Sequence, residues 1–208
     1  MTINKNVLWA SIVLTVLFLL MSFSYREEIF QYRIRWKESA EIVMFGDSHT
    51  AHGKWNFTLH TNPVLRSGWA GYTSDMLVDK IPSTISYNPK FVFILCGGND
   101  IYQKDFSVKN TIVNYRLIAD ILKKNNITPI FQKLMYQHNN PEFNKIIDSI
   151  NMDLTNYCKK EQIDLIDIGN KMYDSKGLRA DLTIDNLHLN QKGYDLWSVA
   201  INDYLKNK

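Results

Sequence analysis

The chain has 208 residues, of which 45% are apolar, and its formal net charge is +3. This length fits one domain with a short extension, and the apolar fraction is sufficient for a full core. Residues 1–40 carry five basic and three acidic side chains, which leaves 19 and 18 of the chain's 24 and 21 for everything after residue 40. The near-neutral remainder has no basic stripe, which argues against nucleic acid as a partner.

The beginning of the chain contains an uncharged, apolar run over residues 7–23. Because a bilayer-spanning helix needs about 20 apolar residues, we expect residues 1–23 to form a transmembrane helix that anchors the chain. A cleaved signal peptide is the first alternative, and a buried core helix is the second. Residues 24–40 are charged and aromatic without a clean period, and are expected to form a juxtamembrane linker or a short helix.

The membrane side of the remaining chain is predicted from the flanking charges and the domain length. One basic side chain precedes the apolar run and four follow it within residues 24–40. Taken literally, the positive-inside rule would favour a cytoplasmic domain, but long domains are translocated largely regardless of flanking charge. We therefore expect a single-pass membrane protein whose folded domain lies on the non-cytoplasmic side.

From residue 41 onward, short apolar runs alternate with amphipathic helical patterns. The apolar runs predict strands over residues 42–45, 63–67, 91–96, 127–134 and 164–168. Apolar side chains at helical spacing predict helices near residues 74–80 and over 108–124, 141–160 and 191–205. This alternation builds βαβ units. We predict one α/β domain over residues 41–208, a flavodoxin-like three-layer α/β/α sandwich with a five-stranded parallel sheet.

Short polar or glycine-rich segments follow three of the predicted strands, and one more precedes the last helix. They are Gly46-Asp47-Ser48, Gly68 with Gly71, Gly97-Gly98-Asn99-Asp100, and Asp185 with His188. Because parallel strands end at one edge of a sheet, these segments are expected to meet there. Each alone has an ordinary explanation, since Gly-Gly-Asn-Asp is typical of a turn and Asp185 with His188 could cap the following helix.

Taken together, the four segments contain the groups that a hydrolytic site requires. A serine hydroxyl such as Ser48 becomes a nucleophile when a neighbouring base accepts its proton, and His188 suits that role. Asp185, three residues earlier, can hold the opposite ring nitrogen and fix the tautomer. The backbone N–H groups of Ser48 and Gly71 and the side-chain amide of Asn99 could form an oxyanion hole.

This set resembles the SGNH (GDSL-type) hydrolase family, whose blocks carry Ser, Gly, Asn and a D-x-x-H pair in that order. The resemblance covers residues 41 to about 205. It implies that Ser48, Asp185 and His188 are catalytic and that Ser48, Gly71 and Asn99 form the oxyanion hole, with Gly68 as the alternative glycine. Two departures are mild. Gly68-Trp69 replaces the Asn-x-Gly lead-in of many members, and His49 follows the serine where an aliphatic residue is more common.

Several residues beside these segments are candidates for the substrate pocket: His49, Trp69, Tyr72 and Tyr102. The aromatic ones could form an apolar or sugar-stacking wall, although core or surface packing is their usual role. His49 and His52 are three residues apart, but no matching carboxylate or cysteine cluster accompanies them, so no metal site is expected. The two cysteines lack metal-ligand spacing, and no cofactor is expected.

The resemblance implies a serine esterase that acts on a small-molecule, glycan or lipid ester, and the apolar run over residues 7–23 predicts that this esterase is tethered to a membrane. The absence of an obvious lid insertion favours short acyl groups, such as O-acetyl on envelope polysaccharide. Alternatives with the same chemistry are an acyltransferase, a lysophospholipase and a thioesterase. An alternative of another class is a non-catalytic, membrane-anchored binding module on the same fold. The sequence makes no prediction of the oligomeric state.

Overall fold

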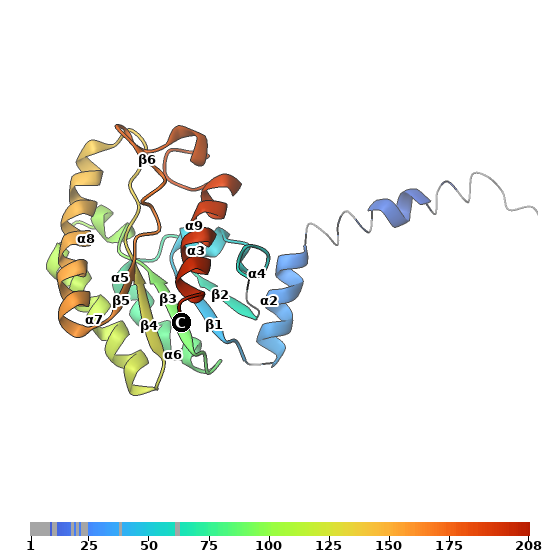
Figure 1. Cartoon of the computed structure of the whole chain (residues 1–208), viewed down its shortest axis with the longest axis horizontal. Helices are drawn as coiled ribbons and strands as arrows, with labels where there is room; N and C mark the ends of the chain where they lie inside the picture. Colours follow the sequence, from blue (N-terminus) through green and yellow to red (C-terminus); the bar gives the residue numbers. More distant parts are fainter. Residues whose placement is uncertain are drawn as a thin grey trace, which may run out of the picture.

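Five parallel strands form the centre of the protein (Figure 1). The computed structural model describes residues 9, 12–17, 19, 21, 25–37, 39–60 and 63–208. The strands are β1 (Ile42–Gly46), β2 (Val64–Gly68), β3 (Phe91–Leu95), β4 (Thr128–Gln132) and β5 (Asp164–Ile166), and their order across the sheet is β2-β1-β3-β4-β5. Every pair of neighbouring strands is parallel. The predicted five-stranded parallel sheet is therefore confirmed.

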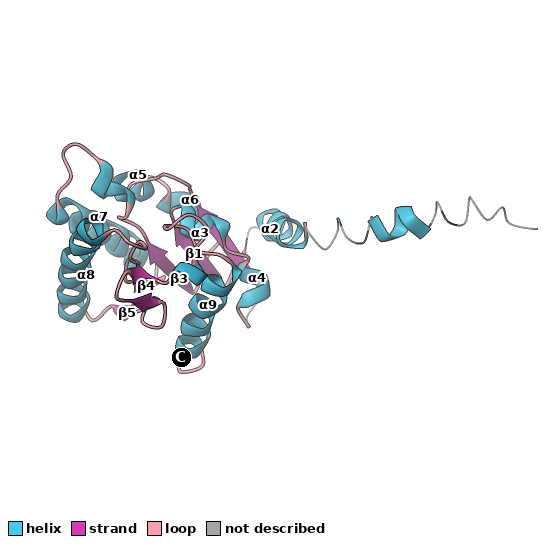
Figure 2. Ribbon diagram, turned by 90° about the horizontal axis from the view of Figure 1, so that it is seen from above, coloured by secondary structure: helices cyan, strands magenta, loops and turns pink. Residues whose placement is uncertain are grey.

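The central strands are apolar because the sheet is covered on both faces. Every residue of β1 and β3 is buried, as expected of strands that contact helices above and below. The helices α5 (Ser74–Val78), α6 (Ile81–Ile85), α7 (Val108–Lys124) and α8 (Pro141–Glu161) lie on one side of the sheet. The other side carries α4 (Trp55–Thr58) and α9 (Gln191–Leu205) (Figure 2). These layers make the predicted α/β/α sandwich.

Local sequence signals explain where the long helices begin. The side chains of Ser107, Asn140 and Asn190 cap α7, α8 and α9, because each accepts a hydrogen bond from a backbone N–H three residues later. Pro141 occupies the first turn of α8, where its missing N–H costs nothing. The remaining elements are short: α3 (Ser48–His52), the 3₁₀ helices η1 (Asn99–Tyr102) and η2 (Ala180–Leu182), and a hairpin of β6 (Tyr173–Asp174) and β7 (Gly177–Leu178).

Residues 26–37, for which a linker or a short helix was expected, form α2 (Arg26–Lys37), and this helix packs along the edge strand β2. The buried side chain of Gln31 makes the principal contact. Its amide nitrogen donates to the carbonyl of Val64 (2.9 Å), and its amide oxygen accepts from the backbone N–H of Arg66 (2.8 Å). These are the bonds that another strand would make, so α2 satisfies an edge that would otherwise be free to pair with another chain.

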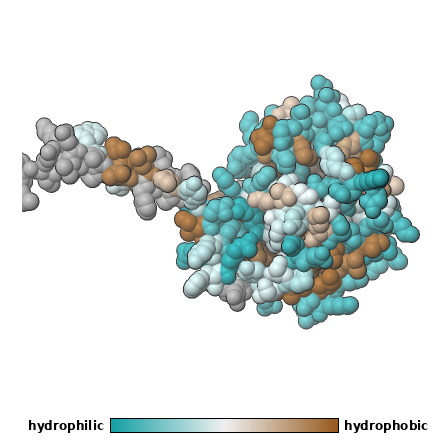
Figure 3. All heavy atoms as spheres, turned by 180° about the vertical axis from the view of Figure 1, so that it is seen from behind, coloured by the Kyte–Doolittle hydropathy of each residue, from teal (hydrophilic) through white to brown (hydrophobic). Residues whose placement is uncertain are grey.

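The predicted transmembrane helix, and with it the single-pass membrane localisation, is wrong for the part of the chain that the structure describes. None of the helices formed by the described residues is both long and apolar enough to cross a bilayer. The described residues of the apolar run are 9, 12–17, 19 and 21. Figure 3 shows hydrophobic atoms on this described part of the extension, while the visible face of the domain is mainly hydrophilic. The other residues of the run lie outside the described ones.

Candidate active site

Ser48 lies at the point where β1 turns into α3. Gly46 ends the strand, and a Cβ there would lie 2.1 Å from the carbonyl oxygen of Leu95, so the turn requires glycine at this position. Asp47 then caps α3, because its carboxylate accepts the backbone N–H of His49 (3.0 Å). This arrangement places Ser48 as the first residue of the helix, at the carboxyl edge of the sheet, with 9% of its surface exposed.

His188 and Asp185 meet Ser48 from a loop 140 residues later in the chain. The Oγ atom of Ser48 lies 3.0 Å from Nε2 of His188, and Nδ1 of His188 lies 2.7 Å from a carboxylate oxygen of Asp185. The other carboxylate oxygen of Asp185 accepts the backbone N–H groups of Leu187 (3.1 Å) and His188 (2.6 Å). The structure therefore brings the three predicted residues into one hydrogen-bonded chain.

Asp185 is held in its ionised form. Burial opposes ionisation, but the hydrogen bonds from the ring and backbone of His188 and from the backbone of Leu187 outweigh it and lower the pKa of Asp185 to about 2. A carboxylate that stays charged near neutral pH fixes the proton of His188 on Nδ1. Nε2 is then free to accept the hydroxyl proton of Ser48.

Two glycines compete for the predicted oxyanion position, and their surroundings differ. Gly68 packs beneath α3, where an added Cβ would lie 2.3 Å from the backbone nitrogen of Ala51. Gly71 has a positive φ of 77°, and an added Cβ would meet nothing within 4 Å. Gly68 is thus a packing residue, whereas the open side of Gly71 leaves its turn accessible to a ligand.

Asn99 follows β3 at the start of η1. One hydrogen of its side-chain amide is donated to the carbonyl of Tyr72 (2.9 Å). Since an amide nitrogen carries two hydrogens, this contact orients the group and leaves the second hydrogen for another acceptor.

Two further histidines from α3 flank His188. The ring centroids of His49 and His52 lie 5.3 and 5.4 Å from that of His188. Nε2 of His49 lies 3.1 Å from the carbonyl oxygen of Leu187. Burial lowers the pKa of His49, but the hydrogen bond and charge of Asp47 and the Leu187 carbonyl raise it to a net value above the ordinary one. The pKa of His52 is lowered, first by burial and then by His188 and the neighbouring cations.

The sequence reasoning assigned His49 to the pocket wall and missed its tether to the His188 loop. The signal that could have found the flanking pair is its spacing, because residues three apart share one face of a helix. No described group of three or more His, Cys, Asp or Glu side chains is arranged to hold a metal ion.

A narrow cavity of about 30 Å³ adjoins Ser48. His49, Asn99 and Tyr102 line it together with a wall of apolar side chains, namely Leu95, Leu134, Met135, Phe143, Ile147 and Leu187. Tyr102 stacks on Phe143 and its hydroxyl accepts a hydrogen bond from Gln137 (2.6 Å). The predicted pocket residues Trp69 and Tyr72 do not line this cavity, and instead stack on each other with centroids 6.3 Å apart.

Comparison with known proteins places this chain in a family. Residues 44–196 match the family model of the GDSL-like lipase/acylhydrolase family. The fold is similar to a GDSL-like lipase from Bacteroides thetaiotaomicron, with a TM-score of 0.72 and 24% identity over 82% of this chain and 89% of that one. It is also similar to the lipase/acylhydrolase from Enterococcus faecalis, with a TM-score of 0.67 and 21% identity over 80% of this chain and 95% of that one.

Among curated proteins, the chain is similar to an N-acylneuraminate cytidylyltransferase of Streptococcus agalactiae, with 28% identity over 161 residues. The match covers 77% of this chain but 37% of the relative, so the chain spans little more than a third of that protein's length. The family match, in contrast, extends over well over half of the chain. The chain therefore belongs to the GDSL-like lipase/acylhydrolase family.

Proposed function

We propose that the chain is a serine esterase that removes short acyl groups, such as acetyl, from a carbohydrate, with Ser48 as nucleophile. The observation that carries this proposal is the continuous hydrogen-bonded chain from Ser48 through His188 to Asp185, with contacts of 3.0 and 2.7 Å. These distances lie within the range that proton transfer between a nucleophile and its base requires.

In the proposed reaction, the Ser48 hydroxyl oxygen attacks the ester carbonyl while its proton passes to Nε2 of His188. The tetrahedral intermediate collapses when His188 returns that proton to the leaving alcohol, which leaves an acyl-serine. Water then attacks the acyl group, His188 accepts the water proton and passes it to the Ser48 oxygen, and the carboxylic acid is released. Asp185 stays ionised throughout and stabilises the imidazolium that forms twice in the cycle.

The negative charge of each intermediate would be stabilised by an oxyanion hole built from Ser48, Gly71 and Asn99. The side-chain amide nitrogen of Asn99 carries two hydrogens. One is donated to the Tyr72 carbonyl, and the other is available to the oxyanion. The positive φ of Gly71 and the open space beside it support its backbone N–H as a further donor. Loss of one such donor typically costs about 3 kcal/mol of transition-state stabilisation.

The size of the cavity beside Ser48 supports a short acyl group. Its volume of about 30 Å³ is far below the range of about 300–1,000 Å³ that is typical of small-molecule sites. An acetyl methyl fits such a space, whereas a fatty acyl chain would require the apolar wall to move. A carbohydrate alcohol is supported by the similarity in fold to an acetyl xylan esterase, with a TM-score of 0.69 and 19% identity.

Labelling with a fluorophosphonate tests the nucleophile, and hydrolysis of p-nitrophenyl acetate tests the activity. We expect the wild-type chain to be labelled and Ser48→Ala to be unlabelled. We expect Ser48→Ala and His188→Ala to lose activity nearly equally, since nucleophile and base act as a unit. If the folded wild type is not labelled, or if His188→Ala keeps most of the activity, the proposed mechanism is wrong.

A further inference from the structure

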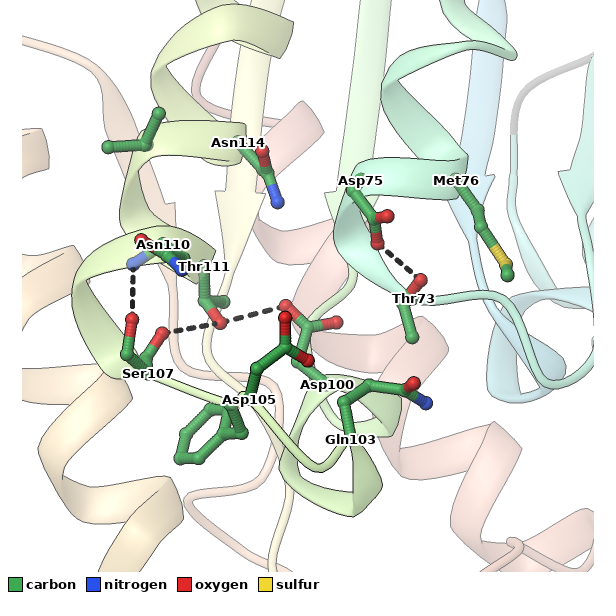
Figure 4. A pocket seen from close by; sticks show the side chains of 12 residues that line it. Thr73, Asp75, Met76, Asp100, Gln103, Asp105, Ser107, Asn110, Thr111 and Asn114 are labelled. Atoms are coloured by element: carbon green, nitrogen blue, oxygen red, sulfur yellow. Dashed lines mark hydrogen bonds between the residues drawn. The ribbon is translucent and has the colours of Figure 1, made fainter.

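A second and much larger cavity lies beyond η1 (Figure 4). Its volume is about 340 Å³, which falls within the range of small-molecule sites and is more than ten times that of the cavity beside Ser48. Its walls come from the first turn of α5, the loop between η1 and α7, and the first turns of α7. A volume of this order can hold a sugar ring.

Asp100 forms the floor of this larger cavity. It is 8% exposed, and its carboxylate accepts the backbone N–H of Ser74 (2.7 Å), the hydroxyl of Ser74 (2.5 Å) and the hydroxyl of Thr111 (2.7 Å). Ser74 belongs to α5 and Thr111 to α7. One buried carboxylate thus ties the three wall segments together, so the cavity is preorganised.

The walls offer hydrogen-bonding groups that the protein does not use itself. The side chains of Gln103, Asp105 and Asn110 line the cavity, and none of them bonds to another residue in the described part of the chain. Figure 4 shows them with Asp75 and Asn114 around one space. Carboxylate and amide oxygens accept from hydroxyls, and amide nitrogens donate to them, which is the chemistry that a polyhydroxylated ring requires.

The charge of the cavity restricts the kind of sugar. Three carboxylates line it, those of Asp75, Asp100 and Asp105, and no Lys or Arg is among the lining residues. An acidic sugar would place its own carboxylate among these groups, and like charges at such distances repel each other. The lining therefore favours a neutral sugar over an anionic one.

The larger cavity is joined to the proposed oxyanion hole through the backbone. Asp100 and Thr73 line the larger cavity. Asp100 directly follows Asn99 in the chain. Thr73 directly follows Tyr72, whose carbonyl accepts a hydrogen bond from the Asn99 amide. The two cavities are therefore lined by consecutive residues of η1, Asn99 and Asp100, although no lining residue is common to both.

We infer that this polar cavity binds the neutral sugar ring of the substrate, and so selects neutral over acidic O-acetylated carbohydrates. This inference rests on the proposed function, because it assigns the alcohol part of the ester to a site of its own. The acyl group and the sugar then occupy two separate cavities on opposite sides of η1.

A matched pair of substrates tests the inference: 2-O-acetyl methyl glucoside and 2-O-acetyl methyl glucuronoside, which differ in one carboxylate. We expect the full chain to have a higher kcat/KM for the glucoside. Asn110→Ala should raise KM for the glucoside about fivefold, the effect of losing one hydrogen bond to a hydroxyl, and leave p-nitrophenyl acetate hydrolysis unchanged. The control is Lys104→Ala, which alters an exposed neighbour outside the cavity. It should change neither the KM for the glucoside nor the hydrolysis of p-nitrophenyl acetate.

Asp105→Asn separates recognition from a merely structural role. It removes one negative charge without removing side-chain volume, so kcat/KM for the glucuronoside should rise about threefold while that for p-nitrophenyl acetate stays the same. Equal use of both sugars by the wild type, or unchanged kinetics in both variants, would overturn the inference.

A separate binding measurement distinguishes failure of the inference from failure of the proposed function. Binding of unacetylated methyl glucoside to the full-length Ser48→Ala chain, followed by ligand-observed NMR, requires no catalysis. Binding that weakens in the Ser48→Ala/Asn110→Ala double variant supports the cavity even if no ester is hydrolysed. Absence of binding, together with wild-type hydrolysis of p-nitrophenyl acetate, rejects the cavity and leaves the esterase intact.

Discussion

His49 joins the helix that carries Ser48 to the loop that carries His188. Its Nε2 lies 3.1 Å from the Leu187 carbonyl, and its own carbonyl accepts the hydroxyl of Tyr194 (2.7 Å). Nε2 of His49 donates its hydrogen to the Leu187 carbonyl, because a carbonyl oxygen can only accept. In the proposed mechanism, His49 would therefore act by positioning His188, since small displacements of a catalytic base lower the rate steeply.

We expect His49→Ala to lower kcat for p-nitrophenyl acetate about tenfold with little change in KM, the size of effect that one lost hydrogen bond produces. His49→Gln, which can still donate to Leu187, should recover part of the loss. His52→Ala is the control, since His52 touches the same imidazole ring without tethering the loop, and should change kcat less than twofold. An equal loss in His49→Gln and His49→Ala would contradict the positioning role.

The pKa of Asp185 links this residue to the acid stability of the fold. Its folded value of about 2 lies below the value of about 3.9 for an unfolded aspartate. Between these values the unfolded chain binds more protons than the folded one, so the contribution of Asp185 is present above pH 4 and is lost as the pH falls towards 2. In urea titrations, wild type should be more stable than Asp185→Asn at pH 6, and the difference should shrink at pH 2.5. A difference that is constant with pH would contradict this assignment.

At the scale of elements, α2 is part of the fold although it precedes the predicted domain. Its buried Gln31 bonds to both backbone groups of the β2 edge and to the buried carboxylate of Glu27 (2.8 Å). Asn56 of α4 also donates to Glu27 (3.1 Å) and to the Val64 carbonyl (2.9 Å). Two elements far apart in the chain thus share one buried polar network.

Removal of the Gln31 amide should deprive the backbone N–H of Arg66 of its side-chain acceptor and leave the Val64 carbonyl and the Glu27 carboxylate with Asn56 as their remaining side-chain donor. We expect Gln31→Ala to lower the free energy of unfolding by about 2–3 kcal/mol, measured by urea denaturation. Tyr32→Ala, which changes the exposed neighbour, should stay within about 0.5 kcal/mol. If both variants unfold at the same urea concentration, α2 does not stabilise the sheet edge in this way.

The elements that could be predicted from sequence are those whose signal is local. The apolar run of β3 and the helical period of α7 and α8 each lie within one stretch of chain, and their predicted bounds agree with the structure to within a few residues. The helix predicted near residues 74–80 is α5, whereas the short helix α6 that follows it was not predicted. The apolar run over residues 7–23 was taken for a membrane span on length and composition alone, and the described residues contain no such helix.

The parts of the site that sequence could not give depend on contacts between distant segments. The order of the motifs was enough to predict that Ser48, Asp185, His188 and Asn99 would meet. It favoured Gly71 over Gly68 but gave no physical reason for the choice, because that reason depends on how closely β2 approaches α3. Nor did it place Trp69 and Tyr72, which stack on each other outside the cavity that Tyr102 enters.

For the molecule as a whole, the parallel sheet determines how the substrate would be divided. Ser48 and Asn99 follow the neighbouring strands β1 and β3, and η1, which begins at Asn99, separates a small apolar cavity from a large polar one. Under the proposed function, core packing would limit the acyl group, whereas surface polar groups would select the alcohol. These two limits can be changed independently by mutation.

Enlarging the small cavity should change the preferred acyl length. Met135 lines it and is 7% exposed, and Met135→Ala would open space for two more methylenes. At about 0.8 kcal/mol per buried methylene, the ratio of kcat/KM for p-nitrophenyl butyrate to that for the acetate should rise about tenfold. Met172→Ala is the matched control, because Met172 is equally part of the core but does not line the cavity. Both variants should lose about 2–5 kcal/mol of stability, so kinetics are compared at a temperature where both are folded. An equal rise in the two variants would mean that general loosening of the core, and not this cavity, sets the acyl length.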